Sequence, residues 1–304
     1  MSVFVNRTLN LKSIKAIGFD MDHTIIRYHS ENLEKLSYDQ SIKKLIQSGY
    51  PEVIKSLVFN YNFCIRGLVL DKARGNIIKL SLFSKVKKAY HGTNELSFSD
   101  TKAIYKGLSI DLNDQNYYPI DTIFSISHGV LFAQLVTLKD QMPELFPQSY
   151  KELEEDVLRV IDLCHRDGSI KNEVVANLDT YIVKDEKIVT ALERLKSSGK
   201  YLWLITNSDY KYTKVIMDYA FNPFLKNSSS WNNLFDVVVT FSRKPYFFTN
   251  PKQTFLQVDP TSGLMSNTEG PYRNEIFQFG NANELEREFK IAGDQILYLG
   301  DHIY

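Results

Sequence analysis

Four apolar runs in this chain stop abruptly at polar or charged residues. The run IKAIGF ends at Asp20, YLWLI ends before Thr206, FDVVVTF ends before Ser242, and ILYLG ends before Asp301. Continuous runs of Val, Ile, Leu and Phe are typical of strands that are buried on both faces of a parallel sheet. The carboxyl ends of such strands meet at one edge, so the four runs predict a single ligand site outside that edge.

Segments with the spacing of amphipathic helices separate these runs. The predicted helices cover residues 38–48, 121–138, 150–165, 172–178, 188–198, 212–219 and 281–291. Residues 66–92 carry short β-rich runs around a turn, which predicts a small antiparallel element, and a hairpin is expected around residues 258–265.

The expected fold class is α/β. We predict a Rossmann-like three-layer α/β/α core with a mostly parallel sheet, an inserted mainly helical cap and a small antiparallel β element. A chain of 304 residues exceeds the usual size of one domain, which supports a core with an insertion. We assign residues 1–116 and 184–304 to the core and residues 117–183 to the cap. Because the chain ends at Tyr304, soon after the fourth run, we expect it to be part of a longer protein.

The composition predicts no attraction of the whole chain to nucleic acid or to a membrane. Lys and Arg number 36, Asp and Glu also number 36, and the net charge is +0. The two cysteines, Cys64 and Cys164, cannot form a disulfide framework, which fits a reducing compartment. No signal peptide is visible, and no run approaches the roughly 18 apolar residues of a membrane span, so we expect a cytoplasmic protein. The oligomeric state stays open, and a homo-oligomer is compatible with the sequence.

Two aspartates one residue apart, Asp20 and Asp22, follow the first run. Such a pair is often no more than two solvated acids in a turn. Its position directly after a buried strand favours a functional site, because a buried carboxylate is costly unless it binds a metal or a cation. Asp301, at the end of the fourth run, adds a carboxylate of the kind that Mg²⁺ binds.

The second and third runs end in groups that suit a phosphate ligand. Thr206, Asn207 and Ser208 supply hydroxyl and amide donors before a predicted helix, although the same residue types also serve as ordinary N-caps. Lys244 supplies a positive charge for a phosphoryl oxygen, or it is a surface lysine in a turn before Pro245.

In this order, the motifs D-x-D-x-T, T-N-S, R-K-P and G-D resemble those of the haloacid-dehalogenase-like phosphohydrolase superfamily. The sequence is more closely similar to the cytosolic purine (IMP/GMP-preferring) 5'-nucleotidase family. The similar segments are FDMDHT, GYP, RGLVLD, KARGNIIKL, TNSDYKYT, RKPYFF, QVDPTSG and YLGDHIY. They are distributed over nearly the whole chain, and TNSDYKYT and RKPYFF are more specific than the superfamily motifs.

The resemblance implies a Mg²⁺-dependent enzyme that removes phosphate from purine nucleoside 5'-monophosphates and also transfers it to nucleosides. Asp20 is the implied nucleophile, which forms an aspartyl-phosphate, and Asp22 is the implied general acid and base. The implied metal ligands are Asp20, the backbone carbonyl of Asp22, and Asp301. Thr206 and Lys244 would hold phosphoryl oxygens, and Asn207 would assist them.

The resemblance also assigns base recognition to the cap. Phe124 would stack on the purine, Asp162 and His165 would face the base, and Lys171 would lie nearby. Without the resemblance, Phe124 is equally a core aromatic residue, and His165 is a cation at a helix C-terminus, where the dipole favours positive charge.

The chain departs from the family pattern at three points. Leu158 stands where the family has an arginine, Arg166 stands where it has a tyrosine, and the second acidic residue expected beyond Asp301 is not in this sequence. Two further hypotheses therefore stay open: a phosphatase for another phosphorylated metabolite, and a catalytically silent nucleotide-binding protein.

Overall fold

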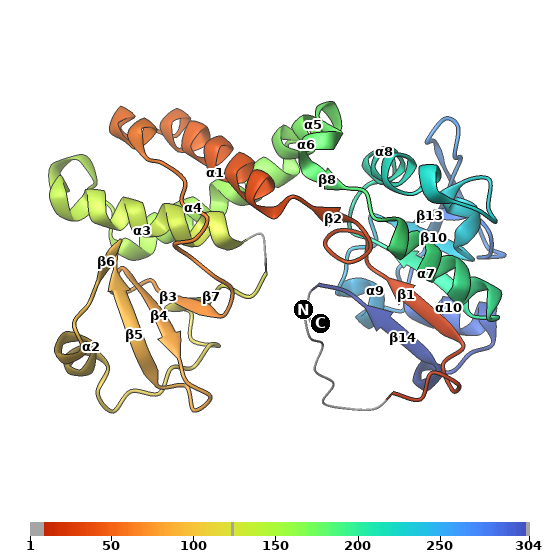
Figure 1. Ribbon diagram of the computed structural model, residues 1–304, viewed down its shortest axis with the longest axis horizontal. Coiled ribbons are helices and arrows are strands. Elements are labelled where there is room, and N and C mark those ends of the chain that lie inside the picture. Colours follow the sequence, from red (N-terminus) through yellow and green to blue (C-terminus); the bar gives the residue numbers. More distant parts are fainter. Residues whose placement is uncertain (1–8, 123–124, 302–304) are drawn as a thin grey trace. The chain divides into compact units, whose positions relative to one another are not determined.

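A computed structural model describes residues 9–122 and 125–301 of the chain (Figure 1). It separates into two compact units. Unit 1 combines the described parts of Met1–Tyr28 and Asn177–Tyr304, and unit 2 is His29–Ala176 without its two undescribed residues.

A seven-stranded sheet forms the centre of unit 1, with the order β12-β11-β13-β10-β9-β1-β14. Neighbouring strands from β14 to β13 are parallel, and β11 and β12 are antiparallel. The four predicted strands and the predicted hairpin are confirmed, whereas β13 was not foreseen. The strands are β1 (Ala16–Phe19), β9 (Tyr201–Ile205), β10 (Val237–Thr240), β11 (Phe255–Val258), β12 (Met265–Asn267), β13 (Ile276–Phe279) and β14 (Ile296–Leu299).

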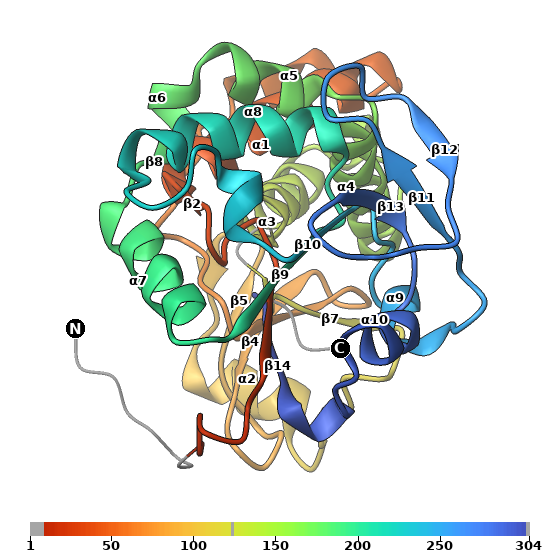
Figure 2. The same cartoon turned by 90° about the vertical axis from the view of Figure 1, so that its right-hand side faces the viewer.

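Helices cover both faces of this sheet, as the predicted three-layer core requires (Figure 2). On one face, Trp203, Val237 and Phe277 pack against Leu285 and Phe289 of α10 (Ala282–Phe289). Figure 2 shows α7 (Glu186–Ser197) on the opposite side of the strands. The described α-helices of unit 1 have between 4 and 12 residues. Its helices are α6 (Leu178–Tyr181), α7 (Glu186–Ser197), α8 (Tyr210–Ala220), α9 (Tyr246–Thr249) and α10 (Ala282–Phe289), its 3-10 turns are Asn222–Phe224, Trp231–Leu234 and Gly293–Gln295, and β2 (Arg27–Tyr28) pairs with β8 (Ile182–Val183).

Unit 2 packs helices on a five-stranded antiparallel sheet with the order β6-β5-β4-β3-β7. The predicted antiparallel element is confirmed and is larger than expected, since β6, β7 and α2 extend it. The strands are β3 (Leu68–Asp71), β4 (Asn76–Leu80), β5 (Val86–His91), β6 (Asn94–Glu95) and β7 (Tyr117–Pro119). The helices are α1 (Ser30–Gln47), α2 (Phe98–Tyr105), α3 (Ile126–Gln141), α4 (Tyr150–Arg166) and α5 (Ser169–Ala176), with 3-10 turns at Glu52–Ser56 and Pro143–Leu145.

The compact units divide the chain at other residues than the sequence suggested. We assigned residues 29–116 to the core, but they lie in unit 2 with the cap helices. The physical reason is one shared hydrophobic core, in which Leu45 of α1 and Ile77 of β4 are buried together with Leu131 of α3 and Val157 of α4. Helix α1 and the small sheet therefore fold with α3 and α4.

Within residues 9–122 and 125–301, no helix combines the length and the apolar composition that crossing a membrane requires.

Glu34 of α1 is an unusual member of the core of unit 2, because it is a carboxyl group with only 1% of its surface exposed. Its Oε2 accepts a hydrogen bond of 2.6 Å from the backbone N of Ser127, in the first turn of α3. Glu34 thus satisfies a backbone donor that the helix itself cannot bond. Burial raises the pKa of Glu34 from 4.5 to about 7, although the hydrogen bond from Ser127 opposes this rise.

The raised pKa predicts a pH-dependent stability. Between pH 4.5 and about 7, the unfolded chain loses the Glu34 proton while the folded chain retains it, so the free energy of unfolding falls as pH rises. We expect Glu34→Gln to remove up to about 3 kcal/mol of this pH dependence. Urea unfolding of both proteins across this pH range measures the effect, with the exposed Glu31→Gln on the same helix as control. Equal pH dependence in wild type and Glu34→Gln would contradict the prediction.

Candidate active site

The ends of the parallel strands bring the predicted site residues to one edge of the sheet. Phe19 is paired with Leu204 on one side and with Leu299 on the other, and the backbone N of Asp20 donates to the Leu299 carbonyl over 2.8 Å. On the neighbouring strand, Thr206 N donates to Val239 O at 2.8 Å. The register therefore places the residues that follow β1, β9, β10 and β14 at a common edge, as the sequence predicted.

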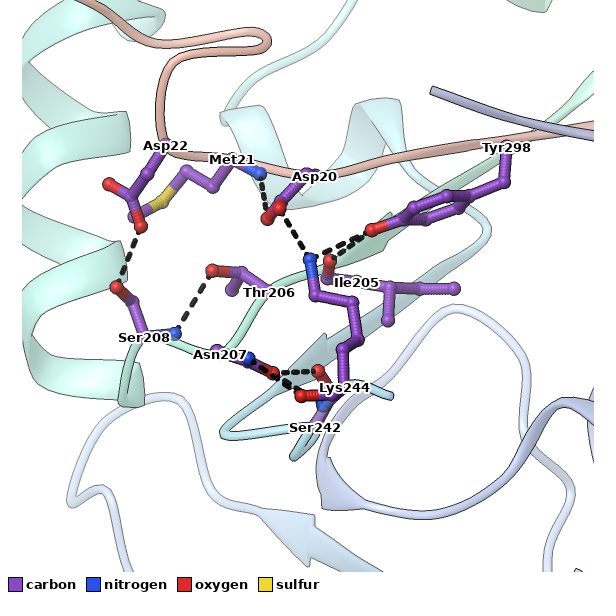
Figure 3. A network of polar contacts seen from close by, with 10 residues as sticks. All are labelled: Asp20, Met21, Asp22, Ile205, Thr206, Asn207, Ser208, Ser242, Lys244 and Tyr298. Carbon is purple, nitrogen blue, oxygen red and sulfur yellow. Dashed lines mark hydrogen bonds and ion pairs between the residues drawn. The ribbon is translucent and has the colours of Figure 1, made fainter. Parts of the chain in front are cut away.

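A buried ion pair lies at the centre of this edge (Figure 3). Lys244 Nζ is 2.5 Å from Asp20 Oδ2, and the side chains are 1% and 11% exposed. Lys244 Nζ also donates to the Tyr298 hydroxyl at 2.8 Å, and that hydroxyl donates to the Ile205 carbonyl at 3.1 Å. Asp20 Oδ1 accepts from the backbone N of Met21 at 2.7 Å. The interpretation of Lys244 as a surface lysine is therefore wrong.

Burial acts on both members of the pair in opposite directions. It raises the pKa of Asp20, and the nearby positive charge of Lys244 opposes that rise. It lowers the pKa of Lys244, and the negative charges of Asp20, Asp22 and Asp301 oppose that fall. Each residue thus depends on the other to stay charged away from water.

Asp22 has different surroundings from those of Asp20. Its Oδ1 accepts a hydrogen bond of 2.5 Å from the Tyr28 hydroxyl, and its Oδ2 accepts one of 2.8 Å from the Ser208 hydroxyl. Tyr28 is itself 3.0 Å from the hydroxyl of Tyr212. Burial and the charge of Asp22 raise the pKa of Tyr28, so this phenol stays protonated and available as a donor. Hydroxyl groups hold Asp22, whereas an ammonium group holds Asp20.

Asn207 fixes the loop that carries Lys244. Its Oδ1 accepts from the Ser242 hydroxyl at 2.9 Å and from Lys244 N at 2.7 Å, and its Nδ2 donates to Lys244 O at 3.2 Å. All the hydrogen bonds described for the Asn207 side chain are therefore made to other groups of the protein. A role of Asn207 at the phosphate stays a prediction.

Thr206, Asn207 and Ser208 do not form the N-cap of the next helix. That position belongs to Asp209, whose side chain accepts from Tyr212 N at 3.0 Å at the start of α8. Thr206 is fully buried, and its Oγ1 accepts from Ser208 N at 3.0 Å. A hydroxyl that accepts one hydrogen bond keeps its own proton for donation, for example to a phosphoryl oxygen.

The oxygen atoms at this edge suit a magnesium ion. Asp20 and Asp301 are carboxylates, and Asp22 adds a backbone carbonyl, which gives a set of hard donors without sulfur or imidazole. Mg²⁺ binds through one or two carboxylates plus water and substrate oxygens. In the described part of the chain, no group of three or more His, Cys, Asp and Glu side chains is placed to hold a metal ion. A magnesium ion at this edge, with water or substrate as further ligands, stays a prediction.

Comparison with known proteins identifies the family. The family model described as "5' nucleotidase family" matches residues 3–304. The chain belongs to the 5' nucleotidase family. It is 28% identical over 311 residues to a 5'-nucleotidase domain-containing protein of Dictyostelium discoideum, and the matched region covers 99% of this chain and 52% of the relative. It is 27% identical over 316 residues to human 5'-nucleotidase domain-containing protein 2, covering 100% of this chain and 59% of the relative. The chain thus spans little more than half the length of either relative.

The base-recognition residues predicted for this 5' nucleotidase family chain belong to unit 2. Asp162 and His165 are three residues apart on α4, which puts them on the same face of the helix, and Lys171 is on α5. Asp162 is exposed, and His165 and Lys171 are half-buried. Phe124 lies outside the described residues. His165 is in the last turn of α4, where the helix dipole favours a positive charge whether or not the residue binds a base. Its role in base recognition therefore stays a prediction.

Two tyrosines of the candidate site were not foreseen. Tyr28 holds Asp22, and Tyr298 holds Lys244. A signal for Tyr298 was present in the sequence, because Gly18 interrupts an apolar strand, and such a glycine often marks a close approach. Gly18 is the register partner of Tyr298, and a Cβ at Gly18 would lie 2.8 Å from the tyrosine ring. No comparable signal distinguishes Tyr28.

The buried pair leads to a stability prediction. Lys244→Met leaves the Asp20 carboxylate without its cation, and we expect a loss of about 3–5 kcal/mol in the free energy of unfolding. Adding Asp20→Asn should recover part of that loss, because the unpaired charge is then removed. Chemical denaturation of the single and double variants measures this, with the exposed Lys252→Met as control. Strictly additive losses would show that the two residues are not coupled.

Proposed function

We propose that this chain carries the catalytic site of a Mg²⁺-dependent 5'-nucleotidase of the haloacid-dehalogenase-like type, which hydrolyses purine nucleoside 5'-monophosphates. The observation that carries the proposal is the contrast between two neighbouring carboxylates. Asp20 is paired with Lys244, and Asp22 is held by the hydroxyls of Tyr28 and Ser208. Membership of the 5' nucleotidase family and the names of the two relatives support the same class of reaction.

Asp20 is the proposed nucleophile. A carboxylate oxygen of Asp20 attacks the phosphorus, the bond from phosphorus to the nucleoside 5'-oxygen breaks, and an aspartyl-phosphate forms. The positive charge of Lys244, whose Nζ is 2.5 Å from Asp20 Oδ2, would also attract the phosphoryl oxygens. Lys244 and the Thr206 hydroxyl would offset the charge on those oxygens, and Asn207 would keep the Lys244 loop in place.

Asp22 is the proposed general acid and base. In the first step it gives a proton to the departing 5'-oxygen, and in the second it takes a proton from the attacking water. That water then releases phosphate from Asp20. The hydrogen bonds from Tyr28 and Ser208 fix the direction of the Asp22 carboxyl group, so that it meets the same oxygen position in both steps.

The groups that would hold Mg²⁺ are a carboxylate oxygen of Asp20, the backbone carbonyl of Asp22, and Asp301. When bound, the ion would act as a Lewis acid and offset negative charge on the phosphoryl oxygens.

Unit 2 is the proposed source of selectivity. Phe124, Asp162, His165 and Lys171 would recognise the purine base, and a nucleoside in place of water would accept the phosphoryl group. A phosphatase for another phosphorylated metabolite is the second candidate. It is favoured by Leu158 and Arg166, the two departures from the family pattern on α4, which line a surface cavity together with Asp162. Phosphate release from IMP, GMP, pyrimidine nucleotides and sugar phosphates separates the two candidates.

The nucleophile is tested by substitution. We expect Asp20→Asn to reduce phosphate release from IMP or GMP by at least about a thousandfold, because the amide cannot form the covalent intermediate. The exposed Asp294→Asn serves as a matched control and should retain full activity. Full activity of Asp20→Asn would refute the mechanism. Nucleotide binding by the wild type without any phosphate release would identify a silent binding protein instead.

The metal is tested by removal. We expect EDTA to abolish phosphate release and added Mg²⁺ to restore it. Asp301→Asn should raise the Mg²⁺ concentration needed for half-maximal activity by at least about tenfold, since one carboxylate is lost. Activity that is unchanged in EDTA would remove Mg²⁺ from the proposal and leave the assignment of Asp20 to be judged separately.

A further inference from the structure

The turn between β4 and β5 in unit 2 exposes two large apolar side chains. Leu82 is 99% exposed and Phe83 is 82% exposed. At its other end the hairpin is attached to α3, since His91 pairs with Asp140 at 2.8 Å and Thr93 N donates to Thr137 Oγ1 at 2.9 Å. The turn is therefore at the end of the hairpin that is remote from α3, at the lower edge of the small sheet in Figure 1. Turns normally carry small or polar residues, so the exposure of Leu82 and Phe83 in this turn calls for a functional explanation.

The turn has a defined conformation that presents these side chains. The Ser81 hydroxyl accepts from Phe83 N at 3.3 Å and from Lys85 N at 3.2 Å, and Ser84 N donates to Ser81 O at 3.0 Å. A second loop supports it, because Lys85 Nζ donates to Leu108 O at 3.0 Å and Ile110 N donates to Ser84 O at 2.9 Å. The exposed pair is thus held outward by a hydrogen-bonded turn.

Positive charges surround the exposed pair. Between Asp71 and Glu95 the sequence contains no acidic residue, and Lys79, Lys85, Lys87 and Lys88 lie in or beside the turn. Lys72 and Arg74 lie at the opposite end of β4, where they pair with Glu154 and Asp71. Lys88 is paired with Glu95 at 3.0 Å. The side chains of Lys79 and Lys87 form no hydrogen bond or ion pair with the residues that the structure describes, and both residues are exposed. Asp111 and Asp114 are the acids of the supporting loop, so the cations outnumber the acids around the turn.

We propose that this hairpin tip binds an anionic lipid surface. Leu82 and Phe83 would enter the boundary between headgroups and acyl chains, and the lysines would contact the negatively charged headgroups. Two exposed side chains on a convex tip match a soft surface, which needs no complementary groove. A protein partner would need a larger contact, and a second copy of the same tip would be repelled by like charge. This local excess of positive charge is not evident from the net charge of the whole chain, which is zero.

Vesicle binding by the full chain tests the proposal. We expect the wild type to co-sediment with phosphatidylcholine vesicles that contain about one third phosphatidylserine, and not with phosphatidylcholine alone. Leu82→Ser with Phe83→Ser should weaken the binding at least about tenfold, and so should Lys79→Gln with Lys87→Gln. Binding should also fall with added salt, because the attraction of the lysines is screened.

The chain offers a matched control. Leu264 and Met265, at the turn of the β11–β12 hairpin, are 73% and 52% exposed, and residues 253–270 contain no Lys or Arg. Leu264→Ser with Met265→Ser should leave vesicle binding unchanged. Absence of binding to anionic vesicles, or equal binding by wild type and the Leu82/Phe83 variant, would overturn the proposal. Circular dichroism of each variant confirms that the fold is retained.

Discussion

The buried ion pair between Lys244 and Asp20 is the interaction on which the candidate site depends. Neither charge is stable alone at that depth, and each is held from a different strand end, so the pair joins β1 to the loop after β10. Asn207 and Tyr298 then hold Lys244 from the ends of two further strands. The four strand ends are therefore connected by specific hydrogen bonds as well as by the sheet itself.

The sequence predicts some of the residues around the ion pair but not others. Asp20, Thr206 and Asp301 follow buried apolar runs, and the parallel pairing of those runs is enough to bring them together. Lys244 also follows an apolar run, but a lysine before a proline is equally expected on the surface. Only the packed structure shows that it is buried. Tyr28 could not be found from the sequence, since its contact with Asp22 depends on how the chain turns back after the first strand.

The fold, too, could be predicted only in part from the sequence. Strands β1, β9, β10 and β14 were visible because each is continuously apolar, whereas β13 is a short strand preceded by a long polar segment, and only pairing with β10 and β11 defines it. The unit boundaries were not visible, because Leu45, Ile77 and Leu131 give no indication in sequence that they share a core. Local pattern predicts elements, and long-range packing decides which elements fold together.

Gly18 has a consequence for how this sequence can vary. The ring of Tyr298 occupies the volume that a side chain at position 18 would need, and the same ring carries the hydroxyl that holds Lys244. The two positions therefore share a single volume across β1 and β14. Relatives with a larger residue at position 18 should have a smaller one at position 298, and they would need another group to orient the lysine. Substitutions at these two positions are expected to be correlated, although neither residue carries charge or reacts.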